Sequence, residues 1–171
     1  NREAQSIGGV LFFALICFWA FRLGLYLFLR NRKKGEDSRY QDMKKNWGDN
    51  PFLQAYFKVF ILQSVLMYVA GLPILFVGLL EEVAIGPIQY IFALISFGAV
   101  IYEGIADSQK NQFKKHSPNK FCNVGLYKYS RYPNYFGEMV FWWSISLMMV
   151  DQIFNLKLIV GPLFLTVLMI K

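Results

Sequence analysis

Five long apolar runs restrict what this chain can fold into. They cover residues 6–29, 55–80, 85–102, 136–150 and 153–170. Most reach the length of about 20 residues with which a helix crosses the hydrocarbon core of a bilayer. A helix also satisfies its own backbone hydrogen bonds, which lipid cannot do. The runs therefore predict an all-α integral membrane bundle with about five transmembrane helices.

Composition agrees with a membrane protein. Hydrophobic residues make up 56% of the chain and aromatic residues 18%, which is too apolar for water as the main solvent. The chain opens without methionine on a short polar stub and stops at Lys171, where the fifth run ends. We therefore expect one transmembrane domain over residues 1–171, truncated at one or both ends, with further helices in the full protein.

The net charge of +7 indicates topology before it indicates a ligand. Segment 30–51 holds seven Lys and Arg residues and segment 103–135 holds six, while Glu81, Glu82 and Asp151 lie between the other runs. Lys and Arg collect on the inner side of a membrane. We therefore place both basic segments on the positive-inside side, and we expect no nucleic-acid partner.

Smaller signals refine this plan. Residues 37–47 suit a short interfacial helix, and the Gly-Leu-Pro at 71–73 should bend or interrupt the second run. Gly86 and Pro87 should close a tight hairpin before the third run. The two cysteines, Cys17 and Cys122, form no disulfide framework and no metal-ligand spacing, so we expect no metal site.

Ionisable groups inside the apolar runs are costly and need partners. Arg22 either extends to the basic end of its helix or, with Tyr26 one turn later on the same face, presents a guanidinium and a phenol to a ligand. Gln63 favours an interhelical hydrogen bond. Glu103 and Asp107 share a face at i and i+4, either as a wet helix end or as acceptors for a ligand's hydroxyl or amide groups.

The start of the fourth helix suits an anion. Pro133 fits a first-turn position, with Ser130 or Asn134 as the cap. A helix N-terminus beside Lys128 and Arg131 attracts negative charge. Lys114, seven residues after Asp107 and back on the same face, could hold a phosphate.

An amide, a carboxylate and an indole recur every four residues below that helix start. They belong to Asn134, Glu138 and Trp142, and at this spacing they form one stripe. Each alone suits a structural role, as a cap, a buried ion-pair partner or an interfacial aromatic. Together they favour a ligand whose charged end lies in the loops and whose flat polar head enters the membrane.

The same stretch carries a family resemblance. The sequence SRYPNYFGEMVFWW resembles the SRHPNYxGE…WW signature of the steroid 5-alpha-reductase-like (DUF1295-type) membrane proteins, which are related to the sterol reductases. The stretches FWAFRLGLYLFLRNRKKGEDSRY and ADSQKNQF resemble that family's first and middle blocks, in the same order. The three blocks extend over roughly residues 18–150, most of the chain.

The resemblance implies an all-helical membrane fold with an NADPH cavity open to the cytosolic side. It implies reduction of a carbon–carbon double bond conjugated to a carbonyl in a steroid or other lipid. By position, Asn134 and Glu138 resemble the nicotinamide contacts. Further cofactor-site positions carried over or argued above are Arg22, Tyr26, Glu103, Asp107, Lys114 and Arg131.

The proton donor and two substitutions keep a second function open. By the resemblance, Trp19 stands at the position of the tyrosine that donates the proton in the family, which leaves Tyr135 as the candidate catalytic residue. Tyr132 stands where the family signature has histidine. The alternative is therefore a catalytically silent, reductase-like accessory subunit of a larger membrane complex. The expected partners are membrane lipids, a lipid or steroid substrate and, in the alternative, other subunits. The resemblance favours the endoplasmic reticulum, with a mitochondrial or other organellar inner membrane as the alternative.

Overall fold

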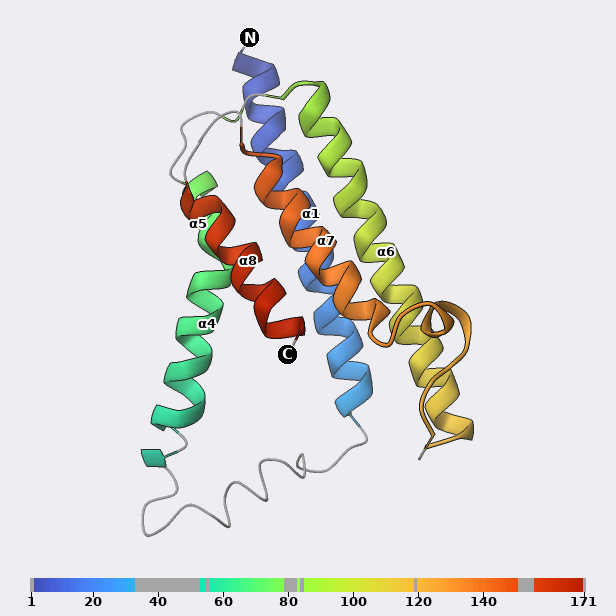
Figure 1. Ribbon diagram of the computed structural model, residues 1–171. Helices are drawn as coiled ribbons and strands as arrows, with labels where there is room; N and C mark the ends of the chain where they lie inside the picture. Colours follow the sequence, from blue (N-terminus) through green and yellow to red (C-terminus); the bar gives the residue numbers. More distant parts are fainter. Residues whose placement is uncertain are drawn as a thin grey trace.

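The computed structural model describes residues 2–32, 53–54, 56–78, 83, 85–118, 120–150 and 156–170, and every regular element in these ranges is helical. The elements are α1 (Arg2–Asn31), the π-helical η1 (Tyr56–Ile61), α4 (Leu62–Ala70), α5 (Leu72–Gly78), α6 (Pro87–His116), the 3-10 turn η2 (Gly125–Lys128), α7 (Pro133–Leu147) and α8 (Leu156–Ile170). The all-α prediction is confirmed for the described ranges (Figure 1).

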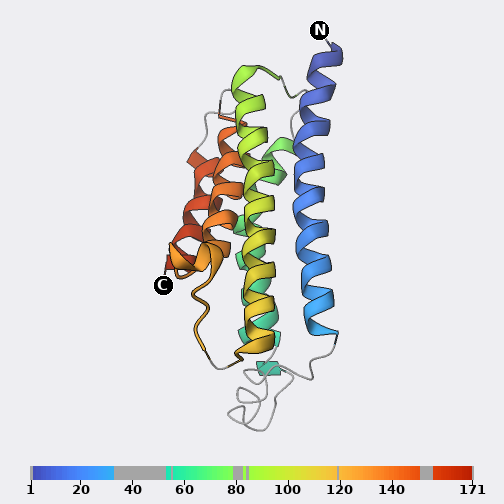
Figure 2. The same cartoon turned by 90° about the vertical axis from the view of Figure 1, so that its right-hand side faces the viewer.

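The long helices form a bundle in which α7 packs between α6, at one edge, and α8 (Figure 1). Helices α1 and α6 run side by side in the same direction, so that the C-terminal ends of both lie at one end of the bundle (Figures 1 and 2). Helix α7 returns antiparallel to α6, and α8 packs on α7 and on the α4–α5 pair. The C-terminal ends of α1 (Asn31) and α6 (His116) therefore lie at the same end of the bundle, which we call the basic end.

The second predicted run is interrupted where its sequence indicated. Helix α4 ends at Ala70 and α5 begins at Leu72, with Gly71 between them. A Cβ built on Gly161 of α8 would lie 2.9 Å from the carbonyl oxygen of Val69, so α8 crosses this break at close range. The predicted Gln63 hydrogen bond is not among the described contacts, and Gln63 is exposed.

Helix α6 corrects one predicted boundary. The apolar run ends at Tyr102, and the sequence assigns residues 103–135 to an inner-side loop, although the spacing of Glu103, Asp107 and Lys114 indicates one helix face. The helix continues to His116. Residues 103–116 include three Lys and two Gln, which favour a helix in water. Hydropathy gave the end of the apolar run at Tyr102, whereas the helix extends about four turns farther.

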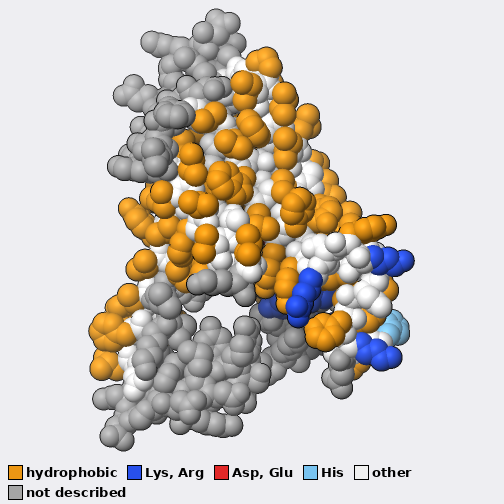
Figure 3. Space-filling view, in the orientation of Figure 1, with side chains coloured by type: hydrophobic (Ala, Val, Ile, Leu, Met, Phe, Trp, Pro, Cys, Tyr) orange, Lys and Arg blue, Asp and Glu red, His pale blue; other side chains and the backbone are white. Residues whose placement is uncertain are grey.

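Membrane character is supported by two of the helices. Within the described ranges, Ile7–Asn31 and Pro87–His116 are long and apolar enough to cross a membrane. Large apolar side chains cover the face drawn in Figure 3, and its Lys and Arg side chains gather at the lower right. Phe21 and Leu94, at 71% and 72% exposed, are typical of a surface that contacts lipid.

The core lies where α6 and α7 meet the first half of α1. Its fully buried side chains include Phe12, Val100, Phe141, Ile145 and Met148. Gln89 near the start of α6 donates to the carbonyl oxygen of Met148 at 3.3 Å, which fixes the antiparallel register of α6 and α7.

Several sequence predictions lie outside the described residues. These are the interfacial helix at 37–47 and the acidic residues Glu81, Glu82 and Asp151.

Candidate functional site

Arg22 joins two carboxylates of α6. Its Nη2 lies 2.5 Å from Oε1 of Glu103, and its Nη1 lies 3.0 Å from Oδ2 of Asp107. The two acceptors are one turn apart, so one planar guanidinium spans them. The stem of Arg22 passes beside Gly104, where a Cβ would lie 3.6 Å from Cδ of Arg22, an ordinary contact distance. Arg22 therefore pairs across helices and does not extend to the basic end.

Glu138 is held by two indoles. Trp19 of α1 donates from Nε1 to one carboxylate oxygen at 3.1 Å, and Trp142 of α7 donates to the other at 2.9 Å. Trp19 also stacks on Phe141, with ring centroids 5.5 Å apart. The predicted stripe is therefore real as a helix face, but Trp142 is 4% exposed and faces Glu138 within the protein.

The carboxylates of α6, Glu103 and Asp107, lie near Glu138 of α7 because the two helices approach closely. A Cβ built on Gly137 would lie 3.0 Å from Cβ of Glu103 and 3.1 Å from the carbonyl oxygen of Ala99. A side chain at this position fits only if its neighbours on α6 shift by a few tenths of an ångström. The close approach brings Glu103 to the level of Glu138, so three carboxylates and Arg22 share one layer of the bundle.

The start of α7 differs in part from its prediction. Pro133 is the first helical residue, as expected, but the N-cap is Tyr132 and no side chain caps it. The predicted caps were wrong: Ser130 accepts a hydrogen bond from the Tyr132 N–H at 3.3 Å, before the helix begins. Asn134 lies inside the helix, and its Oδ1 is buried with no hydrogen-bond partner among the described residues.

A cavity of about 670 Å³ collects most of the predicted residues, and we call it the central cavity. It lies among α1, α6, α7 and α8. Its wall includes Tyr26, Arg30, Glu103, Asp107, Lys110, Asn111, Lys114, Asn134, Tyr135 and Glu138. Arg22 is absent from this wall and supports it through Glu103 and Asp107.

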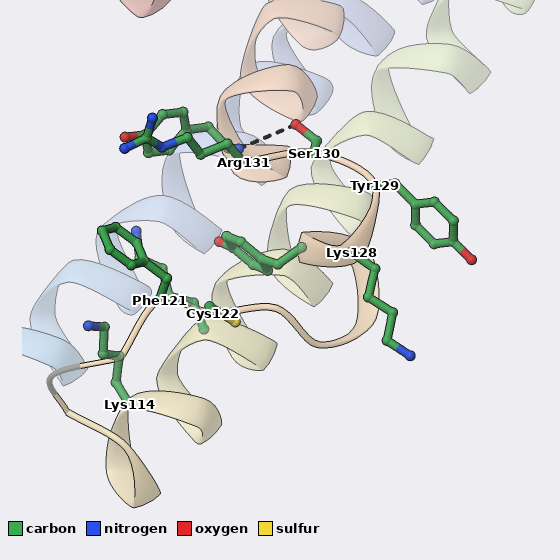
Figure 4. Close-up of a pocket in the computed structure, with 10 residues that line it drawn as sticks. Lys114, Phe121, Cys122, Lys128, Tyr129, Ser130 and Arg131 are labelled. Atoms are coloured by element: carbon green, nitrogen blue, oxygen red, sulfur yellow. Dashed lines mark hydrogen bonds between the residues drawn. The ribbon is translucent and has the colours of Figure 1, made fainter.

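A second cavity of about 620 Å³ adjoins the first at Lys110 and Lys114, and we call it the loop cavity. Segment 120–132 forms most of its wall, including Arg131 (Figure 4). Lys114 donates to the carbonyl oxygens of Pro118 and Lys120, at 2.8 and 3.1 Å. Lys114 thus holds the turn after α6, and one of its three protons remains for a ligand.

The predicted proton donor, Tyr135, lines the central cavity at an exposed position. Tyr135 is 41% exposed and stacks on Tyr132, with ring centroids 5.2 Å apart. The Arg131 guanidinium lies 5.5 Å from the Tyr132 ring and 5.9 Å from the Phe121 ring. A row of aromatic rings with one inserted cation therefore connects the two cavities.

Sequence reasoning missed three contributors. Lys110 lines both cavities, and its position one turn after Asp107 and one turn before Lys114 could have revealed it. Tyr127 is 8% exposed, its hydroxyl has no partner among the described residues, and burial raises the pKa of this phenol above its ordinary value. The indole of Trp19 as a partner of Glu138 had no local signal.

Comparison with known proteins identifies the family and goes no further. Searches of curated proteins and of solved structures returned no match. Residues 2–171 match the model of a family described as protein of unknown function (DUF1295). This match confirms the family-level part of the resemblance seen in the sequence. The chain belongs to the DUF1295 family of proteins of unknown function.

Proposed function

We propose that this protein is a membrane-embedded, NADPH-dependent reductase of a carbon–carbon double bond conjugated to a carbonyl in a steroid or other lipid. In this proposal five helices span the bilayer, and the basic end faces the cytosol. The resemblance of three ordered sequence blocks gives the reaction class, and the central cavity supplies a site in which the residues can be tested against it.

The observation that carries the proposal is the unpartnered Oδ1 of Asn134. A buried amide oxygen without a donor costs about 1–3 kcal/mol, so such an atom is rarely left without purpose. Asn134 lines the central cavity, at the position that resembles a nicotinamide contact. The carboxamide of nicotinamide carries the N–H donor that this oxygen lacks, so the residue fits the cofactor.

The charged residues divide the central cavity into two parts. Along α6, Lys110 lies nearer the basic end than Glu103 and Asp107 do, and Arg30 lies in the last turn of α1 at that end. The cationic part would hold the phosphates, and Asn134 the nicotinamide. When bound, NADPH supplies a hydride to the carbon beta to the carbonyl.

The chain's own part in the reaction is to position the substrate and supply a proton. A phenol O–H from Tyr135 would donate to the carbonyl oxygen of the substrate, polarising the double bond. Tyr26, which lines the same cavity, is the second phenol within it. Leu23 and Leu27 of α1, also in this wall, offer apolar contact to a lipid body and exclude water.

A binding titration tests the proposal. Full-length protein in lipid nanodiscs is titrated with NADPH while nicotinamide fluorescence is recorded. Asn134→Ala should weaken binding about three- to tenfold, which is the value of one hydrogen bond. Asn123→Ala removes an exposed amide outside both cavities and serves as the control. Absence of saturable binding, or equal binding by both variants, contradicts the proposal.

One observation favours the accessory-subunit alternative. The two indole N–H groups occupy both oxygens of Glu138, the second residue expected to contact nicotinamide. A carboxylate satisfied within the protein has less capacity left for a ligand. If the alternative holds, NADPH fails to bind and the protein copurifies with other membrane subunits in fixed stoichiometry after mild solubilisation.

A further inference from the structure

Segment 120–132 lies at the depth of lipid headgroups if α6 spans the bilayer. The apolar part of α6 ends at Glu103. The Leu126 N–H donates to Oε1 of Gln109 at 2.8 Å, which places η2 beside Gln109. Six residues of helix separate these positions by about 9 Å, which places η2 at the outer edge of a headgroup layer that is roughly 5–8 Å thick. The segment thus folds back along α6 and stays near the membrane surface.

The loop cavity in this segment has the charge of an anion site. Its lining residues include four cationic ones, Lys110, Lys114, Lys128 and Arg131, of which Lys128 directs its side chain outward (Figure 4), and no carboxylate. The central cavity differs, because its three carboxylates oppose its cations. An anion of the membrane surface would therefore be attracted to the loop cavity more strongly than to the central one.

A buried donor without a partner also lines the loop cavity. Tyr127 is more than nine-tenths buried, and its hydroxyl has no hydrogen-bond partner among the described residues. The raised pKa of this phenol keeps it protonated, so it is a donor at every physiological pH. Ser130 adds a second hydroxyl to the wall. Hydroxyls and cations around one cavity are the groups that bind phosphate oxygens.

Exposed aromatic rings flank the cavity. Figure 4 shows Tyr129 and Lys128 directed away from the cavity on one side, with Phe121 and Arg131 on the other. Tyr129 is 89% exposed and Phe121 is 84% exposed, each close to a cation in sequence or in space. Tyrosine and lysine at headgroup depth anchor proteins to the interface, where a ring meets acyl chains and a cation meets phosphate.

We propose that the loop cavity binds the phosphate group of an anionic phospholipid, with Tyr127, Ser130 and Arg131 as its contacts. This site rests only on the membrane placement of α6 and is independent of reduction. It would attach segment 120–132 to the bilayer and thereby hold the wall that the two cavities share.

Protection of Cys122 from alkylation tests the site, because this half-buried thiol lines the loop cavity. Full-length protein with Cys17→Ser is placed in nanodiscs of phosphatidylcholine alone or with about 30% phosphatidylglycerol, and modified with an uncharged maleimide. Anionic lipid should slow the modification of Cys122 about tenfold. One charge-assisted contact to the phosphate accounts for much of this factor. The same measurement is made with Arg131→Gln and with Tyr127→Phe in both kinds of disc. An anionic surface lowers the local pH and slows maleimide reaction in every variant alike, so the difference between parent and variants reports the site.

The outcomes separate this site from the reductase proposal. Loss of most of the lipid-dependent protection in both variants supports the site. Equal protection in parent and variants overturns it, because surface potential alone then explains the effect. Protection by NADPH in phosphatidylcholine discs, with none from anionic lipid, also overturns it and assigns the cavity to the cofactor. Lipid protection without any NADPH binding would leave this site standing and remove the reductase.

Discussion

Nε1 of Trp19 lies 3.1 Å from Oε2 of Glu138, although 119 residues separate them in sequence. Trp142 supplies the second donor to the same carboxylate at 2.9 Å. A carboxylate inside an apolar bundle usually pairs with a cation, and here Arg22 pairs with Glu103 and Asp107 instead. Two neutral N–H donors thus stabilise Glu138, and they also attach α1 to α7.

Trp19→Phe should destabilise the protein by about 1–3 kcal/mol, because it leaves one oxygen of Glu138 without a donor. The phenyl ring can keep the stacking on Phe141. Trp143→Phe is the matched control: its indole donates to Thr166, whose hydroxyl keeps its bond to the carbonyl oxygen of Pro162, so the cost should be smaller. The measurement is the free energy of unfolding during SDS titration of detergent-solubilised protein. Equal costs would contradict the assigned role of Trp19.

Gly137→Ala should weaken the contact between α6 and α7. The added methyl group would lie 3.0 Å from Cβ of Glu103 and 3.1 Å from the carbonyl oxygen of Ala99, and overpacking of this kind costs about 1–3 kcal/mol. Gly98→Ala on α6 has no atom within 4 Å of the new methyl group and should be neutral or stabilising by up to about 1 kcal/mol. The same SDS titration distinguishes them, and an equal effect of both substitutions would exclude a close approach at Gly137.

Helix positions followed from the sequence, since each of the five apolar runs overlaps at least one helix of the structure. The break at Gly71 was also readable, since Gly and Pro interrupt helices by local geometry. The end of α6 was not, because residues 103–116 are polar and continue the helix beyond the apolar stretch. Hydropathy shows where the residues change from apolar to polar, and it does not show whether the helix continues past that change.

The candidate site was predictable as a set of residues and less so as contacts. The spacing of Glu103 and Asp107, or of Asn134 and Glu138, places each pair on one helix face, and the structure brings all four to one cavity. The indole partner of Glu138 lies on a distant helix, so no local spacing could indicate it. Lys114 was expected to hold a phosphate, yet it donates to two backbone carbonyls, which depend on how the chain turns after α6.

Arg22→Met should destabilise the bundle by about 3–5 kcal/mol, because it leaves Glu103 and Asp107 buried beside each other without their cation. Methionine keeps the apolar stem against Gly104. Adding Glu103→Gln and Asp107→Asn removes the uncompensated charges, so the triple variant should recover most of the loss. Arg30→Met, at an exposed position on the same helix, is the control and should cost little. Failure of the triple variant to recover would show that Arg22 acts through packing and not through charge.

Tyr127 should make the protein sensitive to alkaline pH. Burial raises the pKa of its phenol in the folded state above the ordinary value near 10, so the folded protein retains a proton that the unfolded chain releases. The associated stability is complete below pH of about 10 and decreases as the pH rises above it. Tyr127→Phe should flatten this decrease, whereas Tyr129→Phe, at an 89% exposed position, should leave it in place. Thermal unfolding of both variants between pH 8 and pH about 11 measures the difference. Parallel curves for Tyr127→Phe and the parent would mean that the buried hydroxyl is not the group that titrates.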